Sequence, residues 1–91
     1  MRHHIPDHWK PLLRAHVLQT RGVDRDYLGA SDFPSGRGVR VEWADKSFAV
    51  FRYAFYLRDE VAQQVAVFTE HCGYHFYSTS DDYVVVTELK E

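Results

Sequence analysis

The sequence predicts an α+β fold in which an N-terminal helix precedes a ββαββ core, with an antiparallel sheet of four strands. Ninety-one residues, 45% of them hydrophobic and 26% charged, suit one compact domain with a modest core. The apolar residues recur at helical steps near the N-terminus, alternate from residue 39, and return to helical steps near residue 57. We therefore expect a single domain, 1–91, with a helix and loop over 1–37 and the ββαββ core over 38–91.

The first helix is predicted at about 10–21. Pro11 is tolerated in the first turn of a helix, apolar residues follow it, and Gly22 offers a left-handed stop. Residues 23–28 could add one further helical turn. The segment 29–38, rich in glycine, serine, aspartate and proline, is predicted to be a loop that leads into the sheet.

The first hairpin is predicted from strict alternation after residue 38, followed by Asp45 and Lys46 as a two-residue turn. This turn sets a register that puts the large apolar side chains on one face, the expected core face. The opposed pairs would be Trp43 with Phe48, Val41 with Val50, and Val39 with Arg52.

The second half of the core is predicted as a helix over 58–71 and a hairpin that pairs 74–78 with 83–88 across a turn at 79–82. The helix prediction rests on apolar residues at three- and four-residue steps, and Gly73 follows as a cap. The stripe consists of Leu57, Val61, Val65, Phe68 and Cys72. This helix would cover one face of the four-stranded sheet.

Charge and cysteine content exclude several classes of protein. The formal net charge of −2 gives no overall attraction to nucleic acid or to an anionic membrane. A single cysteine cannot form an internal disulfide, and the N-terminal region lacks the apolar stretch of a signal peptide. No segment approaches the roughly 20 apolar residues that cross a bilayer. We expect a cytoplasmic protein that has no cofactor and does not bind membranes.

His71, Cys72 and His75 are the nearest approach to a metal or nucleophile site. A structural zinc site needs four ligands in recognisable pairs, and a nucleophilic thiolate needs an oriented base; this spacing matches neither requirement. The sequence therefore favours Cys72 as a small core residue and the two histidines as surface or capping groups. We expect no metal and no catalytic residue, and hence no enzyme.

A helix, a glycine turn and a second short helix over 17–28 would resemble the layout of a DNA-binding helix-turn-helix. In that alternative Arg21, Arg25 and Arg37 would contact phosphates. The second helix would be short and acidic, which disfavours contact with a polyanion. Nucleic-acid binding is therefore the alternative function and not the leading one.

The remaining feature is the second face of the predicted sheet, which combines aromatic and charged residues. Interfaces favour aromatic rings and arginine, so we expect protein contacts there, although the same rings could instead belong to the core. The predicted contact residues are Arg40, Glu42, Phe51, Tyr53 and Tyr77. The leading hypothesis is a small non-enzymatic module that binds and modulates or inhibits a larger protein partner, as do inhibitors that belong to mobile elements, such as anti-CRISPR or immunity proteins. The same hypothesis allows a homodimer.

Overall fold

The computed structural model describes residues 5–33, 36–79 and 84–90. Within them the chain forms an α-helix, α1 (Lys10–Arg21), two short 3₁₀ helices, η1 (Asp7–Trp9) and η2 (Ala30–Asp32), and six strands. The strands are β1 (Arg37–Glu42), β2 (Phe48–Arg52), β3 (Ala54–Asp59), β4 (Gln64–Thr69), β5 (Tyr74–Ser78) and β6 (Val85–Lys90). All pairs among these strands are antiparallel, which confirms the α+β class. The chain divides into two compact units, residues 1–32 and 33–91.

The first unit is built on α1, whose bounds confirm the predicted helix at 10–21. Pro11 lies in its first turn, and Gly22 ends it with φ of 74°, its amide donating to the carbonyl of Leu18 at 3.0 Å. The further helical turn predicted at 23–28 is not formed. Pro11 and Gly22 thus set the two ends of this helix. The segment after it forms no helix, because it is polar and has no apolar stripe to bury.

Two ion pairs hold the segment that follows α1. Both terminal nitrogens of Arg25 lie 2.7 Å from the carboxylate oxygens of Asp32, whose side chain is only 3% exposed. The amide of Gly29 donates to the same carboxylate at 2.7 Å. Arg14 of α1 makes a second two-pronged pair with Asp24, but both of these side chains are more than half exposed. The buried carboxylate of Asp32 is therefore the centre of this loop.

The second unit begins with a three-stranded sheet in the order β2-β1-β6. Its first hairpin, β1 with β2, confirms the predicted pairing, but the register differs by one residue. Val39 lies opposite Phe51, where the sequence predicts Arg52. The other predicted pairs, Trp43 with Phe48 and Val41 with Val50, are wrong by the same shift.

The shift arises in the turn, which holds three residues, 44–46, where two were predicted. The amide of Trp43 donates to the carbonyl of Ser47 at 2.9 Å, and the amide of Lys46 donates to the carbonyl of Trp43 at 3.0 Å. Lys46 has φ of 73°, the left-handed conformation that closes a three-residue hairpin loop with a bulge. Because side chains alternate along a strand, one extra turn residue reverses which side chains of β2 face the core.

The second sheet, in the order β3-β4-β5, includes the region predicted as the helix at 58–71, so that prediction is wrong. β3 and β4 are joined by a turn in which the carboxylate of Asp59 accepts hydrogen bonds from the amides of Val61 and Ala62, both at 3.1 Å. Val61, which the helical pattern placed on a buried stripe, is 98% exposed in this turn. Asp59 therefore caps a hairpin turn and not a helix.

β4 explains why the pattern was misleading. Residues 65–69 are all buried, so β4 is covered on both of its faces and shows no alternation. A short unbroken apolar run fits a fully buried strand and a buried helix equally well. The neighbouring residues at helical spacing then favoured the helix.

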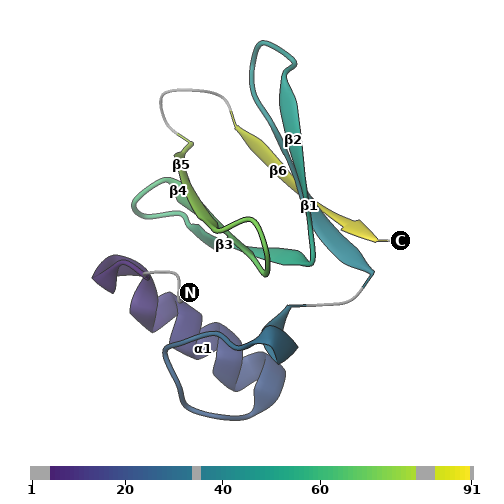
Figure 1. The fold of residues 1–91 in the computed structure, drawn as a ribbon. Coiled ribbons are helices and arrows are strands. Elements are labelled where there is room, and N and C mark those ends of the chain that lie inside the picture. The colour runs from purple at the N-terminus through teal and green to yellow at the C-terminus, as the bar shows by residue number, and fades with distance from the viewer. Residues whose placement is uncertain (1–4, 34–35, 80–83, 91) are drawn as a thin grey trace. The chain divides into compact units, whose positions relative to one another are not determined.

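The second predicted hairpin is also corrected. Its two segments are the strands β5 and β6, but they do not pair with each other. β5 pairs with β4, where Tyr77 lies opposite Val65, and β6 pairs with β1, where Val86 lies opposite Val41. Residues 80–82 of the turn predicted between them, and residue 83 at the start of the second predicted segment, lie outside the described residues. Two three-stranded sheets therefore replace the single four-stranded sheet (Figure 1).

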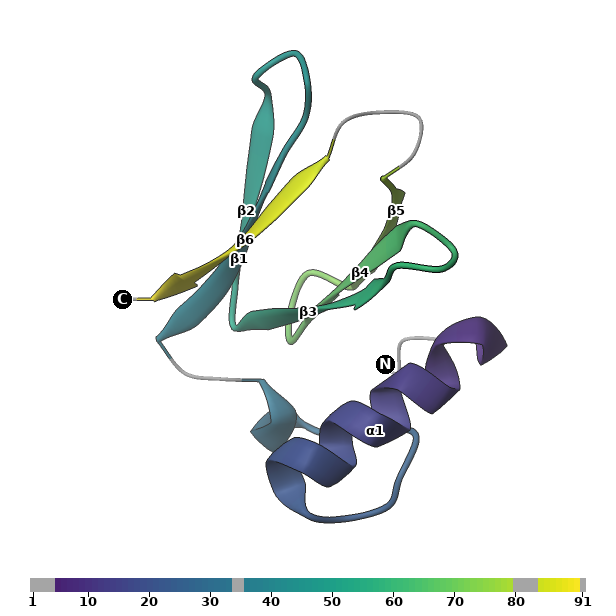
Figure 2. The same ribbon diagram turned by 180° about the vertical axis from the view of Figure 1, so that it is seen from behind.

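The two sheets are joined by one continuous ribbon, because β2 passes into β3 through a bend at Tyr53 (Figure 2). Tyr53 has φ of 52°; its amide donates to the carbonyl of Arg37 at 3.0 Å, and its carbonyl accepts from the amide of Glu70 at 3.1 Å. Residues from both sheets form one buried cluster. This core consists of Val39, Val41, Ala54, Val65, Val67, Val84 and Val86.

Candidate binding surfaces

The five residues predicted as a protein contact do not share one face in the structure. Arg40 and Glu42 alternate with the buried valines of β1 and so project away from the core. Phe51 and Tyr77 pack against the buried core cluster. Tyr53 lies in the bend between β2 and β3 and is 43% exposed. The register shift accounts for Phe51, because it turns that ring to the core side of β2.

We call the side of the β2-β1-β6 sheet that points away from the core the outer face. Residues directly opposite one another in neighbouring strands project to the same side, so the register defines its members. They are Gly38, Arg40, Glu42, Phe48, Val50, Arg52, Val85, Thr87 and Leu89. Phe48 is 57% exposed, Val50 48% and Val85 41%. A sheet face open to solvent ordinarily carries polar side chains, so three large exposed apolar residues set this face apart.

Arg40 lies among these apolar residues. Its guanidinium carbon is 4.3 Å from the centroid of the Phe48 ring, and its Nη2 is 3.0 Å from a carboxylate oxygen of Glu42. Arg40 and Glu42 are both partly exposed. The outer face therefore presents an ordered guanidinium over an aromatic ring, with apolar side chains around them.

Phe48 and Val50 are not among the predicted contact residues, because the predicted register places them on the core side of β2. One signal could have placed them correctly. Two-residue hairpin turns strongly prefer Asn-Gly or Asp-Gly, and the Asp45-Lys46 pair does not fit that preference. A three-residue loop read from that pair gives the observed register.

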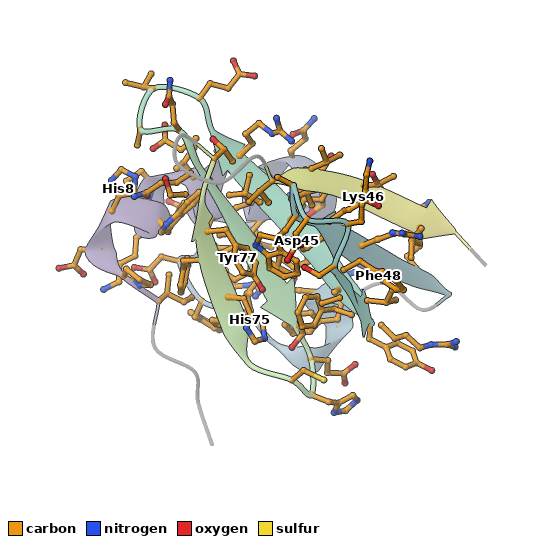
Figure 3. All side chains as sticks on the ribbon, turned by 90° about the horizontal axis from the view of Figure 1, so that it is seen from above. His8, Asp45, Lys46, Phe48, His75 and Tyr77 are labelled. Carbon is orange, nitrogen blue, oxygen red and sulfur yellow. The ribbon has the colours of Figure 1, made fainter. Side chains whose placement is uncertain are left out.

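Four rings on the core side form a continuous series, which we call the aromatic row. Trp43 and Tyr77 meet edge to face with centroids 5.6 Å apart, and Tyr77 stacks on His75 at 6.4 Å. His75 in turn stacks on Phe51 at 4.6 Å. His75 and Tyr77 both lie on β5 (Figure 3). Partial burial raises the pKa of Tyr77. The row fixes the indole of Trp43 against the second sheet.

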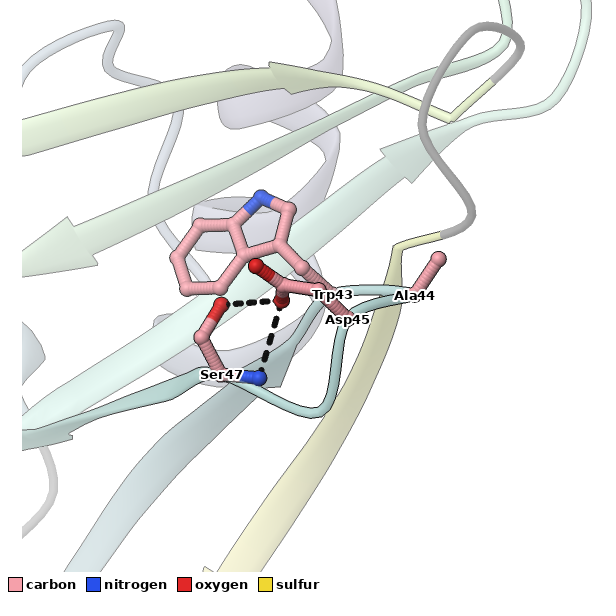
Figure 4. A pocket seen from close by; sticks show the side chains of 4 residues that line it. All are labelled: Trp43, Ala44, Asp45 and Ser47. Atoms are coloured by element: carbon pink, nitrogen blue, oxygen red, sulfur yellow. Dashed lines mark hydrogen bonds between the residues drawn. The ribbon is translucent and has the colours of Figure 1, made fainter.

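A pocket of about 530 Å³ lies beside the turn between β1 and β2 (Figure 4). Its lining includes Trp43, Ala44, Asp45 and Ser47. Oδ1 of Asp45 accepts hydrogen bonds from the hydroxyl and the amide of Ser47, the latter at 2.9 Å. These two hydrogen bonds, the hydroxyl first, lower the pKa of Asp45. The pocket therefore presents an indole and an ionised carboxylate together.

His71, Cys72 and His75 lie around the turn between β4 and β5. Cys72 is exposed, so its predicted place in the core is wrong. Its amide donates to the hydroxyl of Thr69 at 2.8 Å, and Nε2 of His75 lies 2.9 Å from its carbonyl oxygen. Nε2 of His71 lies 3.6 Å from a carboxylate oxygen of Glu70. Among the described residues, no group of three or more histidine, cysteine, aspartate or glutamate side chains is placed to hold a metal ion.

The three arginines of the nucleic-acid alternative lie in different settings. Arg21 is exposed in the last turn of α1, and no second helix of the helix-turn-helix follows it in 22–29. Arg25 is bound on both terminal nitrogens by Asp32. Arg37 belongs to the second unit, and its Nη1 lies 3.4 Å from a carboxylate oxygen of Glu88. Arg25 and Arg37 are thus already paired with carboxylates.

Comparison with known proteins gives no family for this chain. No protein-family model, no curated protein and no solved structure matches it. Within the part of the chain that the structure describes, no helix is both long enough and apolar enough to cross a membrane. Inference about function therefore rests on the outer face and on the pocket beside Trp43.

Proposed function

We propose that this chain is a small non-enzymatic protein-binding module that docks through its outer face on a larger protein partner and modulates or inhibits it. The observation that carries the proposal is the exposure of Phe48, Val50 and Val85 on one face of a sheet around a central arginine. Exposed apolar residues gathered in one place are typical of interaction sites, whereas single scattered ones need no explanation.

The chemistry of the outer face indicates what it would bind. Aromatic rings and arginine are enriched at protein interfaces, since rigid rings supply contact area with little loss of conformational entropy. The Phe48 ring and the guanidinium of Arg40 are already in contact at 4.3 Å, so little ordering is needed on binding. The matching partner surface is apolar and carries a carboxylate that can reach Arg40.

The test is affinity capture with paired variants. Phe48→Ser and Val50→Ser each remove an apolar side chain from the outer face, and Val61→Ser removes an equally apolar, 98% exposed side chain from the turn between β3 and β4. We expect the original chain and Val61→Ser to capture the same protein in stoichiometric amount. Both outer-face variants should bind that protein at least about tenfold more weakly. Thermal unfolding of each variant verifies that the fold is kept.

Two outcomes of this experiment would contradict the proposal. Retention of the same protein by all variants would place the contact elsewhere, and the absence of any stoichiometric protein would remove the binding function. A doubled mass in light scattering that returns to the single-chain value in Phe48→Ser would assign the outer face to a homodimer instead. Nucleic acid in the eluate, released by salt and reduced by Arg21→Ala, would favour the nucleic-acid alternative.

A further inference from the structure

We propose that the pocket beside Trp43 is a binding site for an alkylated ammonium group, such as that of choline or of a methylated lysine side chain. The pocket lies at the turn between β1 and β2, whereas the outer face lies on the opposite side of the β2-β1-β6 sheet from the core, so this site is independent of the proposed docking surface. Four observations on the pocket carry the inference.

The first is that the indole is held in place before any ligand arrives. Trp43 packs against the buried core cluster and meets the ring of Tyr77 edge to face at 5.6 Å, with an angle of 79° between the ring planes. It also lines the pocket, so part of its surface is available to a ligand. An aromatic face attracts a cation through the ring's quadrupole, and tryptophan is the strongest of the aromatic residues in this respect.

The second is a carboxylate in the same pocket. Asp45 is fixed through Oδ1, which accepts from both the amide and the hydroxyl of Ser47. Both hydrogen bonds from Ser47 go to Oδ1 (Figure 4), and among the described residues no ion pair engages the Asp45 carboxylate. A fixed negative charge next to an indole selects a cationic ligand over a neutral one of the same shape.

The third is the apolar character of the rest of the lining. Besides Asp45 and Ser47, the described lining consists of the indole of Trp43 and the methyl group of Ala44. A primary ammonium is strongly hydrated and has three donors to satisfy, and the acceptors of the described lining are confined to one side, on Asp45 and Ser47, which already share a hydrogen bond. An alkylated ammonium carries its charge on an apolar surface and therefore fits better.

The fourth is size. A pocket of about 530 Å³ lies within the range of small-molecule sites and exceeds what a trimethylammonium group alone fills. The remaining space accommodates the chain that bears the group. Free choline and a peptide side chain share this head group, so the experiment compares the two sources directly.

The measurement is tryptophan fluorescence in a Trp9→Phe background, in which Trp43 is the only indole of the chain. The probes are choline, a short peptide containing trimethyl-lysine, and the neutral isostere of choline in which carbon replaces the nitrogen. We expect a saturable change in Trp43 emission with choline or with the peptide, and none with the neutral isostere. Tighter binding of the peptide would identify a protein ligand, and equal binding a small molecule.

Two variants test the assigned residues. Asp45→Asn keeps an acceptor for Ser47 at an exposed position and should weaken binding of the cation about fivefold without changing the fold. Glu60→Gln, which removes an exposed carboxylate from another turn, should leave the affinity unchanged. Trp43→Leu should abolish binding, with thermal unfolding as its control. Equal responses to choline and its neutral isostere, or an unchanged affinity in Asp45→Asn, would overturn the proposal.

Discussion

Gly38 lies so close to Phe51 that a methyl group added to Gly38 would meet the carbonyl oxygen of Phe51 at 2.5 Å. The two residues belong to neighbouring strands: Gly38 lies in β1 and is buried, and Phe51 lies in β2 and is partly buried. A backbone oxygen cannot move aside as a flexible side chain can, so the hairpin requires glycine at this position.

We therefore expect Gly38→Ala to lower the free energy of unfolding by about 1 to 3 kcal/mol, because the strands must separate locally to admit the new methyl group. Urea denaturation monitored by circular dichroism measures this change. Gly29→Ala is the matched control, since its added carbon would meet only the carboxylate of Asp32, at an ordinary contact distance of 3.8 Å. Equal effects of the two substitutions would contradict the explanation.

The Arg25–Asp32 pair should contribute more to stability than the Arg14–Asp24 pair of similar geometry. Asp32→Ala removes the carboxylate that pairs with the Arg25 guanidinium and accepts from the Gly29 amide in a partly buried loop. We expect the free energy of unfolding to fall by about 1 to 3 kcal/mol. Asp24→Ala breaks a pair whose side chains are more than half exposed, and the expected loss is below about 1 kcal/mol. Denaturation of both variants at neutral pH compares them. A larger loss in Asp24→Ala would be inconsistent with the burial of Asp32.

Acid should weaken the protein partly through the same carboxylate. Burial opposes the ionisation of Asp32, but the hydrogen bonds from Arg25 and from the amide of Gly29 outweigh it, and the pKa of Asp32 is lowered. Its contribution is therefore present above the ordinary aspartate pKa of about 3.9 and is lost as the pH falls through the lower folded value. Unfolding free energies measured across this window should fall less steeply in Asp32→Ala than in the original chain.

His16 should add a second pH dependence at higher pH. Burial lowers its pKa, and the nearby charge of Asp32 only partly opposes this effect. The neutral ring is favoured in the folded state, so stability is complete above the ordinary histidine pKa of about 6.5 and declines as the pH falls below it. His16→Gln should flatten this decline. An unchanged slope in His16→Gln would count against the assignment.

The turn between β1 and β2 can be stabilised. Lys46 has φ of 73°, which is strained for any residue with a Cβ atom. Lys46→Gly should therefore raise the free energy of unfolding by about 0.5 kcal/mol, after the greater flexibility of glycine in the unfolded chain is counted. Ala44→Gly is the control in the same turn: Ala44 is not among the described residues with positive φ, so this change should destabilise. Thermal denaturation distinguishes the two signs.

Local signals were readable in the sequence, whereas pairing between distant segments was not. The bounds of α1 follow from Pro11 and Gly22, because each acts within a few residues of its own position. The first hairpin was also readable, but its register depended on the conformation of Lys46 alone. A lysine carries no signal for positive φ, so the poor fit of Asp45-Lys46 to a two-residue turn was the available indication of the longer loop. Phe48 and Val50, predicted on the core face, lie on the outer face for this reason.

The second half of the chain was misread for a different reason. The burial of β4 on both faces removes the alternation by which a strand is recognised. The pairing of β6 with β1 joins the two ends of the second unit, and no local pattern encodes that choice. The predicted contact residues were therefore only partly grouped correctly. Arg40 and Glu42 lie on the outer face, whereas Phe51 and Tyr77 pack against the core.

The pairing of β1 with β6 also bears on how the protein folds as it is made. β1 is the first strand of the second unit to be synthesised, and β6 is synthesised after all the other strands of that unit. Until β6 is complete, one edge of β1 has no partner and Val41 has no Val86 to pack against. Closure across so long a stretch of chain is slow relative to hairpin formation. The nascent chain therefore presents an open strand edge to chaperones and to other nascent chains until its last strand is in place.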